Sequence, residues 1–151
     1  MAPYFRQPKR RGEWAELKFL LRATEAGMTV SKPYGDSARF DFVVGQDRPL
    51  HRVQVRSTRI FTNSRAWVCR FTRSNPPVRY SSRDFDFLAL YVVPHDVWYV
   101  IPMSAIKPAP LYICVYPHIS RSRGRWEQYR EAWCLLTRPG SRESKTKELS
   151  S

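Results

Sequence analysis

An aspartate, a glutamine and an arginine stand in this chain at positions where they could form a small catalytic site. Asp41 lies near the start of an apolar stretch, and Gln54 and Arg56 alternate with Val53 and Val55 after the next turn. Carboxylate, amide and carbonyl oxygens are the ligands that a hard divalent cation such as Mg²⁺ prefers. Hydrolysis of a phosphodiester with this ion needs a carboxylate on the metal, a bound water and positive charge against the phosphate. Asp41, Gln54 and the carbonyl of Val55 are therefore candidate metal ligands, and Arg56 is expected to face the phosphate.

A β-hairpin is predicted to bring these groups together. Residues 40–44 form an apolar run interrupted by Asp41, residues 45–49 are typical of a turn, and residues 51–57 alternate with period two. Side chains two residues apart in a strand point to the same face, so the glutamine and the arginine share a polar face. A polar site at the end of a sheet is the expected result.

A helix before the hairpin supplies another acid. Residues 12–26 carry apolar side chains near the 3.6-residue period, and Gly27 is a typical helix stop. Glu16 on this helix is predicted to reach the site through a water. Glu13 competes for that role, and both acids could instead only complement the helix dipole.

The other predicted elements complete a domain with an α/β or α+β order and a mixed sheet. Strands are expected at residues 28–33, 65–72, 87–93, 97–101 and 111–116, a helical turn at 103–106 and a closing amphipathic helix at 125–136. The strand at 65–72 is expected to continue the meander after the hairpin. Residues 1–11 are interpreted as a basic arm, 12–136 as the domain and 137–151 as a disordered tail.

Composition narrows the classes of protein. The chain has 151 residues, of which 42% are hydrophobic, which suits one globular domain. No apolar run approaches the roughly 18 residues of a membrane helix, and no signal peptide is evident, which predicts a cytoplasmic protein. The three cysteines (Cys69, Cys114 and Cys134) lack a metal-binding spacing and are predicted to be buried, reduced thiols.

Charge favours a polyanionic partner. Twenty-six basic residues against 13 acidic ones give a net charge of +13, which promotes phosphate binding through counterion release. Four arginines that follow the polar strand are predicted to form a phosphate-binding stripe: Arg59, Arg65, Arg70 and Arg73. Arginine enrichment from genome base composition is the alternative explanation.

Four short motifs together resemble the PD-(D/E)XK nuclease superfamily: GxxxE (residues 12–16), PxGD (33–36), FDFVV (40–44) and RVQVR (52–56). The chain resembles the branch of bacterial intron-encoded homing endonucleases in which Gln replaces the usual Glu before x-Lys, and VWYVIP (97–102) is similar to that branch too. The resemblance implies an α/β, restriction-endonuclease-like domain with a mixed central sheet flanked by helices. It also implies Mg²⁺ (or Mn²⁺) as cofactor, double-stranded DNA as substrate and a homo-oligomer.

The resemblance further assigns Glu16 as the helix acid, Asp41 as the metal-binding aspartate and Gln54 as the second metal-site residue. Arg56 departs from the pattern, because it stands in the place of the catalytic lysine. Arginine stays protonated and cannot act as a base, although it can still neutralise charge on the phosphate.

Other interpretations of the same residues remain open. Asp41 could form a salt bridge with Arg39 or Arg52, and Gln54 and Arg56 could be solvent-facing positions of an ordinary edge strand. The protein could then bind DNA without cleaving it, or be a basic RNA-binding protein, although no RNP or KH signature is present.

Overall fold

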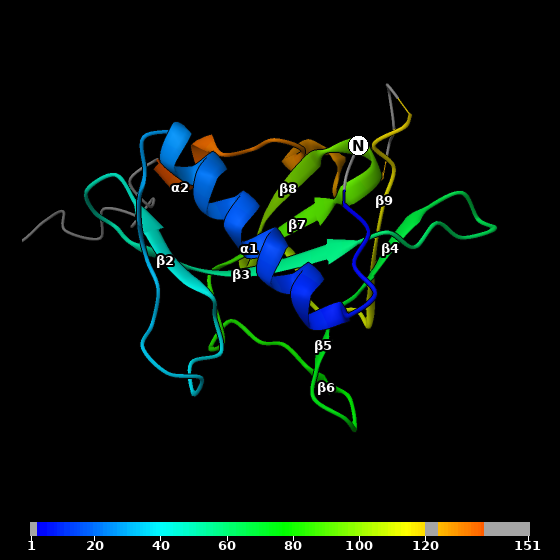
Figure 1. Ribbon diagram of the computed structural model, residues 1–151, viewed down its shortest axis with the longest axis horizontal. Helices are drawn as coiled ribbons and strands as arrows, with labels where there is room; N and C mark the ends of the chain where they lie inside the picture. Colours follow the sequence, from blue (N-terminus) through cyan, green and yellow to red (C-terminus); the bar gives the residue numbers. More distant parts are fainter. Residues whose placement is uncertain (1–2, 120–123, 138–151) are drawn as a thin grey trace, which may run out of the picture.

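The computed structural model of the protein describes residues 3–119 and 124–137. Within these residues a mixed five-stranded sheet carries one long helix on one of its faces (Figure 1). The sheet contains β1 (Thr29–Ser31), β2 (Phe42–Gly45), β3 (His51–Thr58), β7 (Phe87–Val92) and β8 (Val97–Pro102). The other elements are α1 (Pro8–Glu25), β4 (Trp67–Arg70), β5 (Thr72–Arg73), β6 (Val78–Arg79), η1 (Val93–His95), η2 (Met103–Ala105), β9 (Tyr112–Val115), η3 (Glu127–Tyr129) and α2 (Cys134–Thr137).

The predicted hairpin is confirmed as the antiparallel pair β2–β3. β3 then pairs in parallel with β7, so the strand order is β1-β2-β3-β7-β8. The prediction that residues 65–72 continue the meander is wrong, because β4 pairs with β9 outside the main sheet. A parallel pair needs a crossover connection, and the segment containing β4, β5 and β6 serves as that crossover.

Helix α1 begins earlier than predicted. Pro8 occupies its first turn, where the missing N–H costs nothing, and the chain leaves the helix at Gly27 with a φ of +82°. Residues 9–11, interpreted as part of a basic arm, are therefore helical. The residues that α1 buries are Ala15, Phe19 and Ala23, spaced four apart, whereas the apolar Leu17 is 64% exposed.

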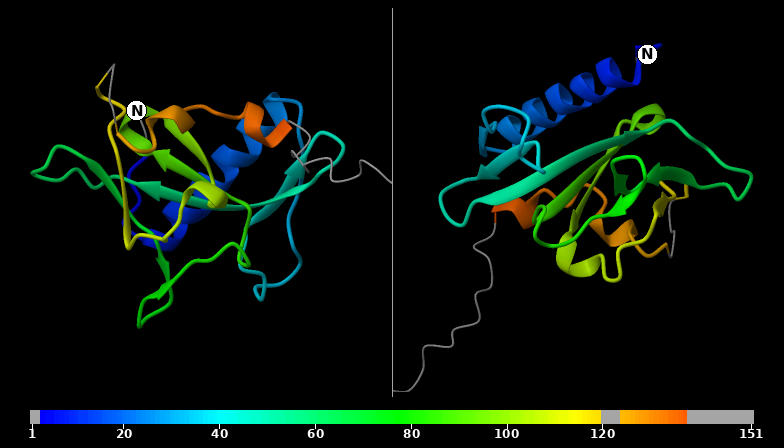
Figure 2. Two further views of the ribbon diagram at one scale, coloured as in Figure 1. Left: turned by 180° about the vertical axis from the view of Figure 1, so that it is seen from behind. Right: turned by 90° about the horizontal axis from the view of Figure 1, so that it is seen from below.

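The two faces of the sheet are covered differently. On one face α1 packs over a core that includes Phe19, Phe42 and Val53, and the right-hand view of Figure 2 shows the helix on this side. On the other face the ribbons β4–β9 and β5–β6 cover a core that includes Leu88 and Ile113. The prediction of a sheet flanked by helices therefore holds for one face only, within the residues that the structure describes.

The predicted closing helix at residues 125–136 is wrong. In its place the chain makes the short turn η3, an extended residue at Arg130 and the four-residue helix α2. Arg130 forms a β-bridge with Tyr99, and Glu131, whose φ is +50°, exchanges hydrogen bonds with the backbone of Trp98 through its own N–H (2.8 Å) and its carboxylate (2.9 Å). Hydrogen bonding to the edge of β8 therefore replaces the helix that the local pattern predicted.

Three further expectations concern the thiols, the tail and the membrane. All three cysteines are free, but Cys69 is buried, Cys114 is half-buried and Cys134 is exposed, so the prediction of three buried thiols is wrong. Residues 138–151 of the predicted tail lie outside the described residues. Among the helices of the described residues, none has the length and apolar character needed to cross a bilayer.

Candidate active site

Asp41 lies at the end of the β2–β3 hairpin away from the turn, where its backbone and its side chain both form hydrogen bonds with β3. It directly precedes β2, and its N–H donates to the carbonyl of Val53 over 2.9 Å. Its carboxylate oxygen Oδ2 accepts the N–H of Val55 over 2.8 Å. Continuing the β2–β3 register by one residue places Asp41 opposite Gln54. The structure therefore brings the acid to the strand that carries the other predicted ligands.

Glu16 approaches the same place from α1. The ring of Phe19, about one turn further along the helix, stacks on Phe42 with 5.4 Å between centroids. This contact fixes the helix against the residue that follows Asp41. The carboxyl groups of Glu16 and Asp41 lie close enough to interact through both charge and a hydrogen bond. Glu16 is thus the acid of α1 that meets Asp41, whereas Glu13 is exposed.

The electrostatic state of Asp41 is unusual for a carboxyl group. Burial raises its pKa to about 7, and the neighbouring charge and hydrogen bond of Glu16 add to the rise. The hydrogen bond from Val55 and the charge of Arg56 lower the pKa, but they do not outweigh burial. A buried acid that faces a second acid has its pKa raised in this way.

The guanidinium groups that could have neutralised Asp41 bind other acids. Arg39 donates to Asp84 over 2.8 Å, and Arg52 meets Asp86 with 3.0 Å between Nη2 and Oδ1. The alternative in which Asp41 forms a salt bridge with Arg39 or Arg52 is therefore wrong. The acid stays available to a cation from solvent.

Gln54 lies on the face of β3 that points away from α1. Val53 and Val55 are buried in the core under the helix, so the alternating Gln54 belongs to the opposite face, where it is half-buried and its β7 partner is Leu88. Because β3 lies between β2 and β7, the edge-strand alternative for Gln54 is wrong. None of the described residues hydrogen-bonds to its side chain, which leaves the amide oxygen free to act as a ligand.

Arg56 is held by the crossover segment. Its Nη2 donates to the hydroxyl of Tyr80 and to the carbonyl of Thr72, the latter over 3.3 Å. The guanidinium carbon lies 5.6 Å from the centroid of the Tyr80 ring. The buried Nε has no partner among the described residues. Arg56 is thus a positioned, half-buried charge near Asp41 rather than a freely exposed side chain.

Sequence reasoning missed two residues at this site. Tyr80 anchors Arg56, and Lys32 lies beside the acids with its Nζ 3.4 Å from Oε2 of Glu16. Lys32 directly follows β1, whose last residue, Ser31, pairs with Val43. The sequence predicted that strand but gave no signal of its partner, and nothing local links Tyr80 to Arg56 across 24 positions.

The four arginines of the predicted stripe are spread over separate segments. Arg59 donates to the carbonyl of Pro3, and Arg70 donates to the hydroxyl of Thr72 over 2.9 Å. Arg65 is exposed in the turn before β4. No contact among the described residues joins these arginines to one another, and the phosphate-binding role of Arg59, Arg65, Arg70 and Arg73 stays a prediction.

The donor set suits a hard divalent cation. The described residues contain no cluster of three or more His, Cys, Asp and Glu side chains that could hold a metal ion. A metal here would instead use the carboxylate of Asp41 with neutral oxygens from Gln54 and Val55, and Glu16 would reach it through a water. Oxygen ligands of this kind fit Mg²⁺ and Mn²⁺, which retain several waters. A bound cation would also offset the repulsion that raises the pKa of Asp41.

The sequence and the fold of the chain are similar to those of known proteins. Residues 6–135 match the PD-(D/E)XK endonuclease family. The solved structure of a bacterial homing endonuclease, I-Ssp6803I, is similar with a TM-score of 0.75 and 30% sequence identity, over 86% of this chain and 93% of that chain. The crystal structure of MepB is more distant, with a TM-score of 0.42 and 12% identity over 80% of this chain and 94% of the other. No curated protein matches the sequence.

Proposed function

The chain belongs to the PD-(D/E)XK endonuclease family, and from this premise we propose that it is a divalent-metal-dependent endonuclease that hydrolyses phosphodiester bonds of duplex DNA. One observation carries the proposal. The carboxylate of Asp41 is buried beside Glu16, is fixed by the N–H of Val55 and forms no ion pair with a guanidinium of the described residues. An arrangement with a raised acid pKa is costly for an ordinary structural aspartate and is useful for binding a cation.

Each residue has a distinct role in this proposal. Bound Mg²⁺ or Mn²⁺ would lower the pKa of a coordinated water and polarise the phosphate. Asp41, Gln54 and the carbonyl of Val55 would hold the ion, and Glu16 would orient a water by accepting its hydrogen bond. Arg56, held in place by Tyr80, would stabilise negative charge on the phosphate without taking up a proton.

The surroundings of the site support a polyanionic substrate. Burial raises the pKa of the Cys69 thiol to about 11, and the charges of Arg56 and Arg11 lower it in part, so both arginines lie near this thiol. Arg11 comes from the first turns of α1 and Arg56 from β3, so two elements bring positive charge to the same thiol, and Arg56 also lies near Asp41. The net charge of +13 adds a long-range attraction for DNA.

Cleavage of a duplex requires access to both strands. A symmetric assembly places one site on each strand, and we therefore include a homo-oligomer in the proposal. The homing endonuclease likeness supports DNA as the substrate. Arg59, Arg65, Arg70 and Arg73 are the residues proposed to contact the phosphates outside the cleaved bond.

A plasmid-nicking assay tests the proposal. The protein is expected to nick supercoiled DNA in Mg²⁺ or Mn²⁺ and to stop in chelator. Asp41→Asn should reduce the rate on the order of 10³-fold or more, because it removes the charge that holds the ion. Asp47→Asn, an exposed aspartate in the loop after β2, is the matched control and should cut normally. Equal rates for the two variants would refute this site.

A non-catalytic DNA-binding protein is the second candidate, and the position of Arg56 favours it. A guanidinium engaged by Tyr80 and Thr72 replaces the lysine of the family pattern. In that case binding should persist in chelator and no nicking should be seen with either metal. Arg56→Lys distinguishes a weakened active site from a lost one, since only the former gains activity.

A further inference from the structure

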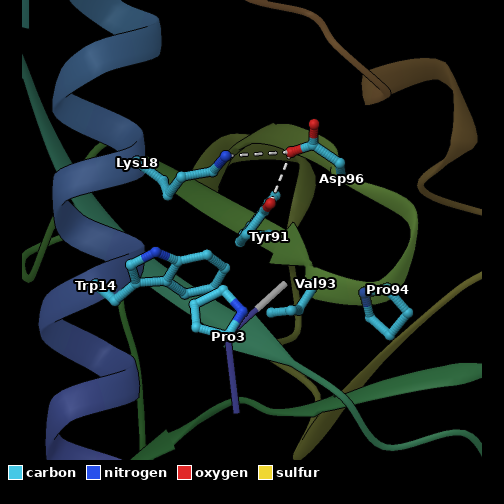
Figure 3. A pocket seen from close by; sticks show the side chains of 7 residues that line it. All are labelled: Pro3, Trp14, Lys18, Tyr91, Val93, Pro94 and Asp96. Carbon is cyan, nitrogen blue, oxygen red and sulfur yellow. Dashed lines mark hydrogen bonds and ion pairs between the residues drawn. The ribbon is translucent and has the colours of Figure 1, made fainter. Parts of the chain in front are cut away.

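A separate cavity of about 430 Å³ lies on the other flank of α1 (Figure 3). Trp14 and Lys18 line it, and they share one side of the helix because they are four residues apart. Glu16, two residues from each, projects from the opposite side. The cavity is therefore distinct from the candidate active site, although both are built on the same helix. Its volume falls within the range that holds a small organic ligand.

The aromatic walls of the cavity are fixed before any ligand arrives. Tyr91 stacks on Trp98 with 4.6 Å between centroids and 21° between planes, and Trp98 is 1% exposed. Trp14 lies 5.7 Å from Tyr91 and is held from the other side by Phe5 at 5.6 Å. Figure 3 shows the rings of Pro3 and Pro94 along the lower part of the cavity. Rigid rings of this kind bind flat aromatic groups with little loss of entropy.

A carboxylate and an ammonium group meet at the other end of the cavity. Oδ1 of Asp96 accepts the Tyr91 hydroxyl over 2.6 Å and lies 3.7 Å from Nζ of Lys18. None of the described residues donates to Oδ2 of the same carboxylate. Asp96 adopts a φ of +50° at the turn after η1, which holds its side chain over the cavity. An acceptor-only group thus stands directly beside a donor-only group.

Positive charge also lies beside Pro3, away from this pair. The pKa of Tyr91 is raised well above its usual value by burial and by its hydrogen bond to Asp96, and the charge of Arg59 lowers it in part. Arg59 therefore lies near the cavity, where its guanidinium donates to the carbonyl of Pro3. A ligand with an aromatic ring at one end and a phosphate at the other would match this distribution of groups.

We infer that this cavity binds a guanine nucleotide, with the base against Trp14, the N1–H and 2-amino donors on Asp96, and O6 facing Lys18. Guanine is the base whose edge presents two adjacent donors beside a carbonyl acceptor, whereas adenine, cytosine and thymine offer a single donor group. Stacking on an aromatic side chain is also a common way to bind a base. The same chemistry could come from a free guanine nucleotide or from an unpaired guanine in a nucleic acid strand.

Calorimetric titration of the full chain with GMP, IMP, AMP and CMP tests this inference in chelator, so that DNA cleavage plays no part. GMP is expected to bind saturably and at least fivefold more tightly than IMP, which lacks the 2-amino group. Asp96→Asn should remove this preference, and Lys18→Met should weaken GMP binding about tenfold. Lys9→Met, which removes the same charge from an exposed position of α1, is the control and should bind GMP normally.

The two sources of guanine are separated by a second titration with short single-stranded oligonucleotides that contain one guanine or none. Binding of the guanine oligonucleotide without binding of GMP, sensitive to both variants, assigns the cavity to nucleic acid. Asp96→Asn and Lys18→Met change rim positions, and circular dichroism is the check that both variants fold. If neither GMP nor the guanine oligonucleotide binds with preference over its control, or if both variants bind like wild type, the inference is wrong. Lys18, Tyr91 and Asp96 then only fasten α1 to β7.

Discussion

Three aspartates near the same hairpin experience opposite environments. Asp84 is 2% exposed and Asp86 is half-buried, and in each case burial alone would raise the pKa of the carboxyl. Burial is outweighed by the combined hydrogen bonds and positive charge, from Arg39 and the N–H of Ser81 at Asp84 and from the side chain and N–H of Arg52 at Asp86, so both pKa values are lowered. At Asp41 burial raises the pKa to about 7, and its acidic neighbour Glu16 adds to the rise where the other two aspartates have an arginine.

This comparison separates Asp84 and Asp86, whose ionised forms stabilise the fold, from Asp41, whose ionised form does not. Arg39 and Arg52, the arginines nearest to Asp41 along the hairpin, instead bind acids that lie 45 and 34 positions further along the chain, Asp84 and Asp86. Among the described residues, neither carboxyl group at the hairpin end forms an ion pair with a guanidinium. A buried acid without such a partner costs stability, as the proposed active site would lead us to expect.

The largest effect on stability is expected from Asp84, one of the two aspartates that bind an arginine. Asp84→Ala removes a charge-assisted bond from Arg39 and a 2.8 Å bond from the N–H of Ser81. The free energy of unfolding at pH 7 should fall by about 2–3 kcal/mol. Urea denaturation measures it, with the exposed turn residue Asp36 changed to Ala as control. A loss no greater than that of the control would show that this acid does not hold the fold.

Asp41 should make the protein less stable as the pH rises, whereas Asp84 and Asp86, with lowered pKa values, should make it more stable. The unfolded carboxyl ionises near pH 3.8, but the folded one holds its proton to about pH 7. The unfolded state therefore binds fewer protons in this interval, and stability falls as pH rises through it. Asp41→Asn should remove this loss and gain about 2 kcal/mol over wild type at pH 8 without metal, partial solvent access limiting the effect. Urea denaturation at pH 5 and pH 8 measures the difference, and equal pH slopes for both proteins would contradict a raised pKa.

A bound divalent metal should offset the cost to stability of placing the carboxyl groups of Asp41 and Glu16 next to each other. At a concentration tenfold above its Kd, Mn²⁺ is expected to stabilise the wild type by about 1.4 kcal/mol, because it binds only the folded state. The stabilisation should be greater at pH 8 than at pH 6, where Asp41 is largely protonated. Differential scanning fluorimetry measures the change in Tm. Asp41→Asn should lose it, and an undiminished shift in that variant would place the metal elsewhere.

Lys32 gives the smallest expected effect. Its ion pair with Glu16 is exposed, so Lys32→Met should change the free energy of unfolding by less than about 0.5 kcal/mol. The variant should nevertheless bind Mn²⁺ a few-fold more tightly, since the ammonium no longer competes with the metal for Glu16. Unchanged affinity would mean that Glu16 does not contribute to the metal site.

Local patterns were sufficient to predict much of the fold and of the site. The alternation in residues 51–57 gave the hairpin and the shared face of Gln54 and Arg56, and the apolar run near residue 87 gave the buried strand β7. The pattern failed at residues 125–136, because Arg130 and Glu131 satisfy the edge of β8 instead of continuing a helix. A helical period describes one segment alone and contains no information about an unpaired strand elsewhere.

The sequence by itself determined that Asp41 interrupts an apolar strand and that a chain with a net charge of +13 favours phosphate-bearing partners, because alternation and charge are properties of neighbouring residues and of composition. Only the tertiary structure decided that Arg39 and Arg52 bind Asp84 and Asp86, that Glu16 meets Asp41, and that Arg56 is held by Tyr80. These partners are brought together by the parallel β3–β7 pairing and the packing of α1, and contacts between distant segments leave no periodic signal in either one.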